Sequence, residues 1–186
     1  MYELWLMLSS LTSSQQFTGC FRVTIVAKEN TTNDVFDRLA VEMMRVYNTE
    51  SAIVFNTQQC YLKKALKTVT LDLEQAKRQN FYYGAKLVRG AYMEQERARA
   101  ALLGYKDPIN PDFEATSAMY HSVLDECLTR IKAFKDAGED PQKIGIMVAS
   151  HNADTVRYGV RRYKSVFNIQ NIFSNLYFTQ NGRTWT

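Results

Sequence analysis

Three short polar segments contain the residues of this sequence that could do chemistry, and each follows a run of apolar residues. They are residues 56–59 (Asn-Thr-Gln-Gln), 89–92 (Arg-Gly-Ala-Tyr) and 150–152 (Ser-His-Asn). If the apolar runs are neighbouring parallel strands, the polar segments meet at the carboxyl ends of those strands, where α/β barrels place their reactive groups. Amides, a cation, a glycine and an imidazole together suit a large polar ligand that carries phosphate.

Each of these residues also has a simpler structural explanation when it is taken alone. Arg89 could belong to a surface turn, and Gly90 could serve only to make that turn. His151 could cap a helix, Gln59 could be a helix-start side chain, and His121 is expected to be structural or exposed. A Ser-His-Asp order, paired catalytic carboxylates, a Walker loop and a glycine-rich dinucleotide fingerprint are all lacking.

Helices and apolar strands must position these segments, and the two kinds of element alternate from about residue 34 to residue 164. Both faces of each predicted strand are apolar, which favours a parallel sheet covered by helices. We expect Gly84 to break the second helix and the segment 104–113, which contains two prolines, to be a loop. Helices are predicted from about residues 34, 62, 93, 120 and 153, and strands at 52–55, 85–88 and 144–149, with 21–27 as a further candidate.

The alternation predicts an α/β fold, a partial (β/α)8 TIM-type barrel. A complete barrel of this kind needs roughly 250 residues, whereas the chain has 186, so several barrel strands are expected to be missing. We divide the chain into an atypical segment 1–30, a barrel part 31–164 and a divergent tail 165–186. The tail shows no clean period and no functional motif.

Composition narrows the classes of partner. The net charge of +4 is mild and the charges are interleaved, which argues against a nucleic-acid surface. Three cysteines with no cysteine–histidine cluster indicate neither a disulfide framework nor a metal site. No run of about 18 apolar residues indicates a membrane span. The apolar start, residues 1–11, is short and carries Glu3, which is not typical of a secretory signal or a transit peptide.

Taken together, the polar segments and their flanks resemble three motifs of the proline dehydrogenase family, particularly of its animal members. The matching stretches are residues 55–63, 86–100 and 147–157, and residues 107–116 are also similar. The resemblance spans about residues 34–163. It implies a distorted (β/α)8 barrel that binds FAD and oxidises L-proline to 1-pyrroline-5-carboxylate. In this family hydride passes to flavin N5 and electrons then pass to a membrane quinone.

The resemblance also implies roles for particular residues. Lys86 would lie beside the flavin as the residue linked to hydride transfer, where many bacterial relatives have arginine. Tyr92 would help line the substrate side. A mitochondrial location and peripheral association with the inner membrane are implied in the same way. The residues implied to contact FAD are Gln59, Lys86, Arg89, Gly90, Ala91, Ser150 and His151.

The sequence departs from the family pattern where the substrate carboxylate should be bound. The family uses a lysine on the first barrel strand and an Arg-Arg pair near the C-terminal end. Lys28 has the wrong surroundings for that lysine, and Arg161-Arg162 come too early for that pair. We therefore expect the isolated chain to lack proline:quinone activity.

Three alternatives stay open. The chain could be a non-catalytic fragment of this family that associates with a partner to complete its barrel. It could serve hydroxyproline instead of proline. A phosphate-binding barrel of unrelated function is the most distant alternative, because fold alone does not fix function.

Overall fold

A six-stranded sheet with the strand order β1-β2-β3-β4-β5-β6 forms the centre of the structure. The first five strands are parallel to their neighbours, and only β6 runs antiparallel, beside β5. The computed structural model describes residues 23–25, 33–90, 93–150, 152–168, 176–180 and 183–185. The strands are β1 (Val23–Ile25), β2 (Val54–Gln59), β3 (Tyr83–Val88), β4 (Ile144–Ala149), β5 (Leu176–Gln180) and β6 (Arg183–Trp185).

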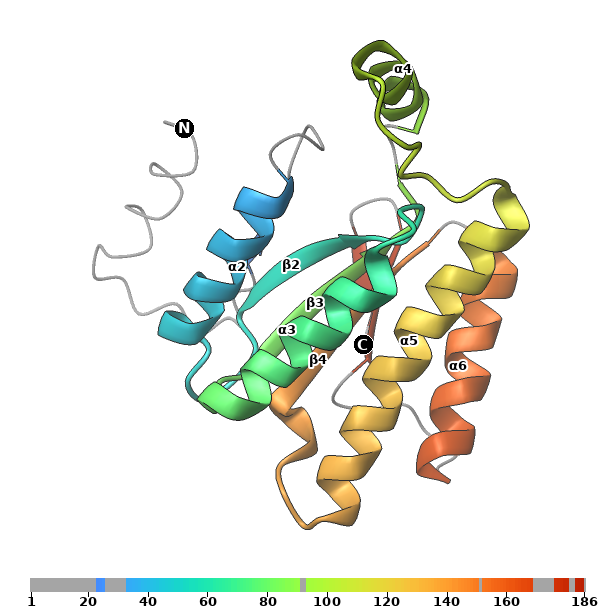
Figure 1. The fold of residues 1–186 in the computed structure, drawn as a ribbon. Coiled ribbons are helices and arrows are strands. Elements are labelled where there is room, and N and C mark those ends of the chain that lie inside the picture. The colour runs from blue at the N-terminus through green and yellow to red at the C-terminus, as the bar shows by residue number, and fades with distance from the viewer. Residues whose placement is uncertain are drawn as a thin grey trace.

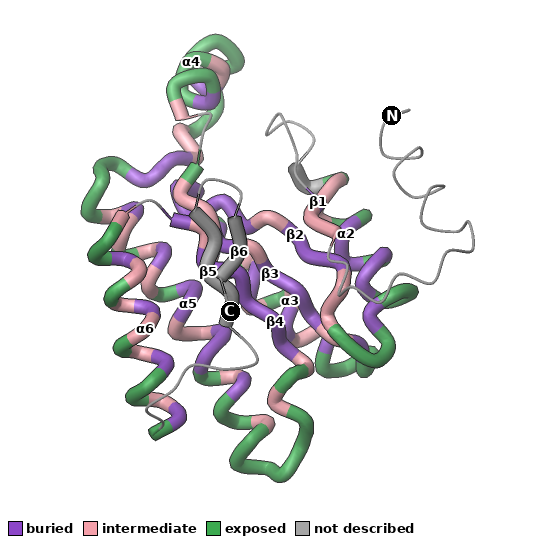
Figure 2. Tube along the Cα trace, turned by 180° about the vertical axis from the view of Figure 1, so that it is seen from behind, coloured by how far each residue is buried: buried purple, intermediate pink, exposed green. Residues whose placement is uncertain are grey.

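Helices connect successive parallel strands and gather on one face of the sheet (Figure 1). They are α2 (Asn33–Tyr47), α3 (Ala65–Gln79), α4 (Met93–Leu103), α5 (Phe113–Asp136), the short 3-10 helix η2 (Pro141–Lys143) and α6 (Ala153–Phe167). Seen from behind, the opposite face of β2, β3 and β4 has no described helix over it (Figure 2). This layering is that of a partial (β/α)8 barrel, as predicted, with helices outside and the other face of the sheet inside.

The main core lies between the sheet and the helices. The central strands are buried on both faces, with β4 buried at every position except its last. Tyr83, Leu124 and Ile131 are among the largest side chains with no exposed surface. Burial on both faces explains why these strands are apolar throughout and do not alternate with polar residues.

The predicted ends of α3 and β3 need one correction, at Gly84. Helix α3 ends at Asn80, whose left-handed backbone (φ 56°) terminates it, and not at Gly84. Gly84 lies inside β3, which begins at Tyr83. The reason is close packing, since a Cβ on Gly84 would lie 2.4 Å from the Val54 carbonyl oxygen.

Strand β2 is longer than predicted, because the polar residues 56–59 belong to the strand and do not follow it. Two of their side chains face the helices and are hydrogen-bonded. Asn56 Nδ2 donates to Asp37 Oδ1 of α2 at 2.9 Å, and Gln58 Nε2 donates to the Tyr83 hydroxyl at 3.3 Å. Polar residues can continue a buried strand when their side chains are hydrogen-bonded in this way.

The expected boundary near residue 164 does not coincide with a structural break. Helix α6 continues to Phe167, which packs in the core, and ends at Asn168 in the left-handed conformation. Residues 176–180 then form β5, which pairs in parallel with β4 in the register Met147↔Tyr177. The sequence pattern predicted neither β5 nor β6.

The connection between β3 and β4 carries an extra helix, α4, which stands away from the sheet at the carboxyl ends of the strands (Figure 1). Its two faces do not differ in polarity, and Leu102 is 84% exposed. The predicted loop after it is ordered by hydrogen bonds to the segment that follows β2. Lys63 N donates to the Pro108 carbonyl at 2.9 Å, and Asn110 Nδ2 donates to the Cys60 carbonyl at 3.0 Å.

Candidate functional site

The inner face of the sheet is built in layers, because residues paired across parallel strands point to the same side. At the amino ends of the strands the layer is apolar. Gly84 pairs with Gly145, and the Phe55 ring fills the space that their missing side chains leave. A Cβ on Gly84 would lie 3.0 Å from Phe55 Cγ, and one on Gly145 would lie 3.2 Å from Phe55 Cζ.

The middle layer contains Lys86. The register pairs Lys86 with Thr57 on β2 and with Met147 on β4. Lys86 is half-buried and Met147 is buried. The Thr57 hydroxyl oxygen is also buried, and no residue in the described part of the chain is its hydrogen-bond partner. A cation and an unpartnered hydroxyl therefore lie side by side on the inner face.

The upper layer, at the carboxyl ends of the strands, contains Gln59. The register pairs Gln59 with Val88, and the Gln59 side chain is 8% exposed. Strand pairing continues past this point, because Tyr61 N donates to the Arg89 carbonyl at 2.9 Å. Lys86 and Gln59, predicted from separate motifs, therefore lie on the same face of neighbouring strands, two residues apart along the strand direction.

Gly90 has a backbone that requires glycine, with φ +143°. The Tyr61 ring lies against it, so a Cβ at this position would be 1.7 Å from Tyr61 Cδ1. Gly90 is therefore more than a simple turn residue, because the Tyr61 ring approaches its backbone closely. Tyr61 was not among the predicted site residues, because an aromatic ring next to a strand end is indistinguishable in sequence from an ordinary core residue.

Arg89 points to the opposite face from Lys86, toward the helices. Its Nη1 donates to Ser117 Oγ of α5 at 2.9 Å, and its Nη2 donates to Thr155 Oγ1 of α6 at 2.6 Å. Its guanidinium also lies 4.8 Å from the centre of the Phe113 ring. Arg89 Nε is buried without a partner among the described residues. Arg89 therefore joins β3 to the amino-terminal parts of two helices.

Ser150 is buried immediately after β4, and its Oγ accepts a hydrogen bond from Asn152 N at 3.1 Å. The Asn152 side chain caps α6 by accepting from Thr155 N at 2.9 Å, as the sequence predicted. Ala91, Tyr92 and His151 lie outside the described residues. The structure therefore brings Gln59 and Lys86 together on the inner face, and Arg89 and Ser150 at the strand ends nearest α6.

His121 and Arg162 lie outside the three motifs and have structural partners. His121 stacks on Tyr158 with ring centroids 3.8 Å apart, and burial, followed by nearby Arg89, lowers its pKa. This agrees with the structural role expected of His121. Arg162 Nε donates to Asp125 Oδ1 of α5 at 2.7 Å.

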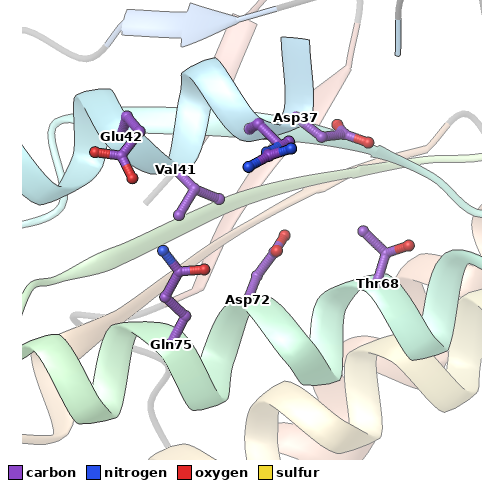
Figure 3. Close-up of a pocket in the computed structure, with 7 residues that line it drawn as sticks. Asp37, Val41, Glu42, Thr68, Asp72 and Gln75 are labelled. Carbon is purple, nitrogen blue, oxygen red and sulfur yellow. The ribbon is translucent and has the colours of Figure 1, made fainter. Parts of the chain in front are cut away.

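Mostly polar side chains line a groove between α2 and α3, on the outer side of the sheet (Figure 3). The groove has a volume of about 360 Å³. Burial and, secondly, the charge of Asp37 raise the pKa of Asp72 to about 7, and the hydrogen bond from Gln58 opposes this. Its lining residues are Asp37, Arg38, Val41, Glu42, Thr68, Asp72 and Gln75.

Other chemistries find little support among the described residues. No three histidine, cysteine or acidic side chains in this part of the chain gather as a metal ion would require. Burial raises the pKa of the Cys60 thiol far above its ordinary value, so Cys60 is not a nucleophile at neutral pH. No helix in the same part of the chain combines the length and apolar character needed to cross a membrane.

Comparison with solved structures supports the barrel assignment. A proline utilization A (PutA) protein of Bradyrhizobium japonicum superposes with a TM-score of 0.68 at 19% identity, covering 86% of this chain and 15% of that one. PutA of Bdellovibrio bacteriovorus gives a TM-score of 0.65 at 21% identity, covering 84% and 15%. At these identities the similarity establishes the fold only.

Curated relatives are more similar in sequence. The chain is 59% identical over 145 residues to mitochondrial proline dehydrogenase 1 of Drosophila melanogaster, covering 78% of this chain and 21% of the relative. It is 50% identical over 145 residues to the Homo sapiens protein of that name, covering 78% and 23%. Hydroxyproline dehydrogenase of Xenopus laevis is 38% identical over 141 residues, covering 76% and 29%.

This chain therefore spans between about a fifth and a third of the length of these relatives. The sequence model of the proline dehydrogenase family matches residues 8–176, which reaches into both segments set apart from the barrel. The match includes Gln59 on β2, Lys86 on β3 and Ser150 immediately after β4. The chain belongs to the proline dehydrogenase family.

Proposed function

We propose that this chain carries the flavin-contacting part of a proline dehydrogenase. In the complete enzyme, L-proline is oxidised to 1-pyrroline-5-carboxylate, FAD accepts the hydride and a quinone takes the electrons. The observation that carries this proposal is the position of Lys86 on the inner face of the sheet, one layer below Gln59. The three family motifs meet there although they are far apart in the sequence.

The residues present fit a bound flavin. The Thr57 hydroxyl is buried and lacks a partner in the described part of the chain, which leaves a polar group on the inner face available to a ligand. An isoalloxazine ring is broad, largely apolar and edged with polar atoms. The inner face offers the same combination, with Phe55 and Met147 among the apolar groups and Thr57, Gln59 and Lys86 among the polar ones.

Each predicted contact residue has a separate task in this proposal. Gln59 and Lys86 would meet the ring system from β2 and β3. Gly90 would let the ligand pass close to the backbone, and Arg89 would fix the ends of α5 and α6 around it. The amino terminus of α6 would supply backbone N–H groups for phosphate. Ala91, Ser150 and His151 would contact FAD, and Tyr92 would help line the substrate side.

Bound FAD would supply the hydride acceptor, its N5 atom. The contribution of this chain is to orient and polarise the cofactor. Lys86 provides a cation on a face that is half-buried, where a charge acts on its surroundings more strongly than it does in water. The cation would stabilise the negative charge that develops when the flavin is reduced.

The names of the relatives support the proposed location, and the proposed acceptor rests on the family resemblance. The Drosophila and human relatives are named mitochondrial, and we propose the same location for this protein. Electron transfer to a quinone would require contact with the membrane surface, so peripheral association with the inner membrane belongs to the same proposal. We propose proline and not hydroxyproline as the substrate. The chain is 59% identical to the Drosophila proline dehydrogenase and 38% identical to the Xenopus hydroxyproline dehydrogenase.

Titration of the purified chain with FAD, followed by flavin absorbance and fluorescence, tests the cofactor proposal. We expect saturable binding and a yellow protein after gel filtration. Dye reduction with L-proline and with trans-4-hydroxyproline is measured on the same sample, and neither is expected to turn over because the carboxylate-binding residues are not found. Lack of FAD binding would favour a non-catalytic fragment, whereas turnover would show that the substrate carboxylate is bound in another way.

A further inference from the structure

Thr57 has the features of a ligand-contacting residue, although the family motifs gave no reason to select it. Its hydroxyl oxygen is buried and has no hydrogen-bond partner within the described part of the chain. Buried hydroxyl groups are nearly always paired in native proteins, and leaving one unpaired costs stability. A buried threonine hydroxyl without a partner among the described residues calls for another explanation.

The position of Thr57 suggests that explanation. In the sheet register Thr57 pairs directly with Lys86, so both side chains lie on the inner face and in the same layer. Gln59 follows two residues later on the same face of β2. The neighbouring residues Asn56 and Gln58 face the helices, where both are hydrogen-bonded. The side chains of residues 56–59 therefore divide into two pairs. Asn56 and Gln58 bind partners within the protein, whereas Thr57 and Gln59 face the proposed ligand.

We infer that the Thr57 hydroxyl hydrogen-bonds to the isoalloxazine ring of the bound flavin, beside Lys86. This inference rests on the proposed function. The ring is the part of FAD that must lie near Lys86, and its nitrogen and carbonyl oxygen atoms can accept the bond that the hydroxyl donates. Thr57 contacts the cofactor and holds the ring against the inner face. The cofactor thereby supplies the hydrogen-bond partner that the Thr57 hydroxyl lacks among the described residues.

The test compares Thr57→Val and Thr57→Ser in the full chain, with Thr70→Val as the matched control. Valine has the shape of threonine without the hydroxyl, and serine keeps the hydroxyl. Thr70 lies on α3, and its hydroxyl donates to the Leu66 carbonyl at 2.9 Å within the same helix. FAD affinity is measured by fluorescence titration, the flavin absorbance spectrum is recorded at saturation, and the melting temperature is measured without FAD.

Thr57→Val is expected to bind FAD about 5- to 10-fold more weakly, as loss of one hydrogen bond implies. Its visible flavin bands should shift, because a bond to the ring is lost. Without FAD its melting temperature should rise by roughly 2–4 °C, since an unpaired buried hydroxyl is removed. Thr57→Ser should stay within about twofold of the unsubstituted affinity, and Thr70→Val should leave both affinity and spectrum unchanged.

Other results overturn the inference in distinguishable ways. A lower melting temperature for Thr57→Val without FAD would mean that the hydroxyl has a structural partner. Unchanged FAD affinity and spectrum in Thr57→Val would exclude the contact while leaving the flavin proposal intact. Absence of FAD binding by the unsubstituted chain would remove both proposals together.

Discussion

Lys86 is the residue whose charge the proposed chemistry uses, and its replacement gives the first prediction. Lys86→Met keeps a long apolar side chain but removes the cation, whereas Lys86→Arg keeps the charge. If the cation stabilises reduced flavin by roughly 1 kcal/mol, Lys86→Met should lower the two-electron potential of the bound flavin by about 20 mV. Spectroelectrochemical titration of the complex measures this. An equal potential in all three proteins would place the flavin away from Lys86.

Gly90 gives a prediction that does not depend on any ligand. Alanine at this position would meet the Tyr61 ring and would adopt φ +143°, which side-chain-bearing residues rarely do. We expect Gly90→Ala to reduce the free energy of unfolding by about 2–4 kcal/mol, measured by urea denaturation.

Gly104→Ala is the control for Gly90→Ala. Gly104 also has a positive φ, of +69°, but nothing lies within 4 Å of its added Cβ. Gly104→Ala should therefore reduce the free energy of unfolding by about 1 kcal/mol, the cost of the positive φ alone. If Gly90→Ala and Gly104→Ala reduce the free energy of unfolding equally, the Tyr61 contact does not restrict the residue at position 90.

Single residues show where sequence was informative and where it was not. Lys86, Gln59 and Gly90 could be selected because their types are unusual beside apolar strands and recur in a family motif. Thr57 could not be selected, since whether a hydroxyl is paired depends on the register between strands that are 29 residues apart in the pair Thr57↔Lys86. Tyr61 and Phe55 were missed for a similar reason, because their importance lies in the glycines they contact.

At the scale of elements, we expect the packing of α2 against α3 to make the free energy of unfolding depend on pH. Asp72 of α3 has a pKa of about 7 in the folded chain, against about 3.9 when exposed. The folded state therefore binds more protons between these two values, and stability falls as pH rises from about 4 to about 7. The stability contributed by protonated Asp72 is complete below about pH 4 and is lost above about pH 7.

Asp72→Asn tests this dependence, because the amide is neutral at every pH and keeps an oxygen for the Gln58 hydrogen bond. Above pH 7 the variant should be more stable than the unsubstituted chain by about 1–2 kcal/mol, and near pH 4 the two should be equal. Thermal unfolding across this range is the measurement. Glu139 is exposed, so the control variant Glu139→Gln should show no such difference in stability. If the stability of Asp72→Asn changed with pH in the same way as that of the unsubstituted chain, the raised pKa of Asp72 would be refuted.

Most elements could be predicted from the sequence, and the exceptions have physical causes. The apolar run 144–149 gave β4 with correct boundaries, because this strand is marked by its own residues. Strand β2 was predicted too short, since its polar half is buried by partners on α2 and β3 that come from other parts of the chain. β5 pairs only with β4 and β6 among the described strands, and no local pattern revealed it.

At the scale of the whole molecule, the sheet is open. Its order runs from β1 to β6 without closing, so the described strands leave two edges instead of the continuous ring of a complete barrel. Unpaired strand edges favour association with other chains. We expect the isolated chain to associate reversibly, so that its mass in light scattering rises with protein concentration. A monomer mass at every concentration would show that the edges are protected.

Because α4 projects from the sheet, the chain should tolerate insertions and proteolytic cuts in this helix. The loop behind it is fastened to the segment after β2 by Lys63 and Asn110, and α4 itself packs little against the sheet. A peptide inserted near Leu102, or a protease cut there, would thus leave both flanking segments anchored. The tip of α4 is therefore a natural place to attach a fluorophore or an affinity tag while the strands on either side keep their register.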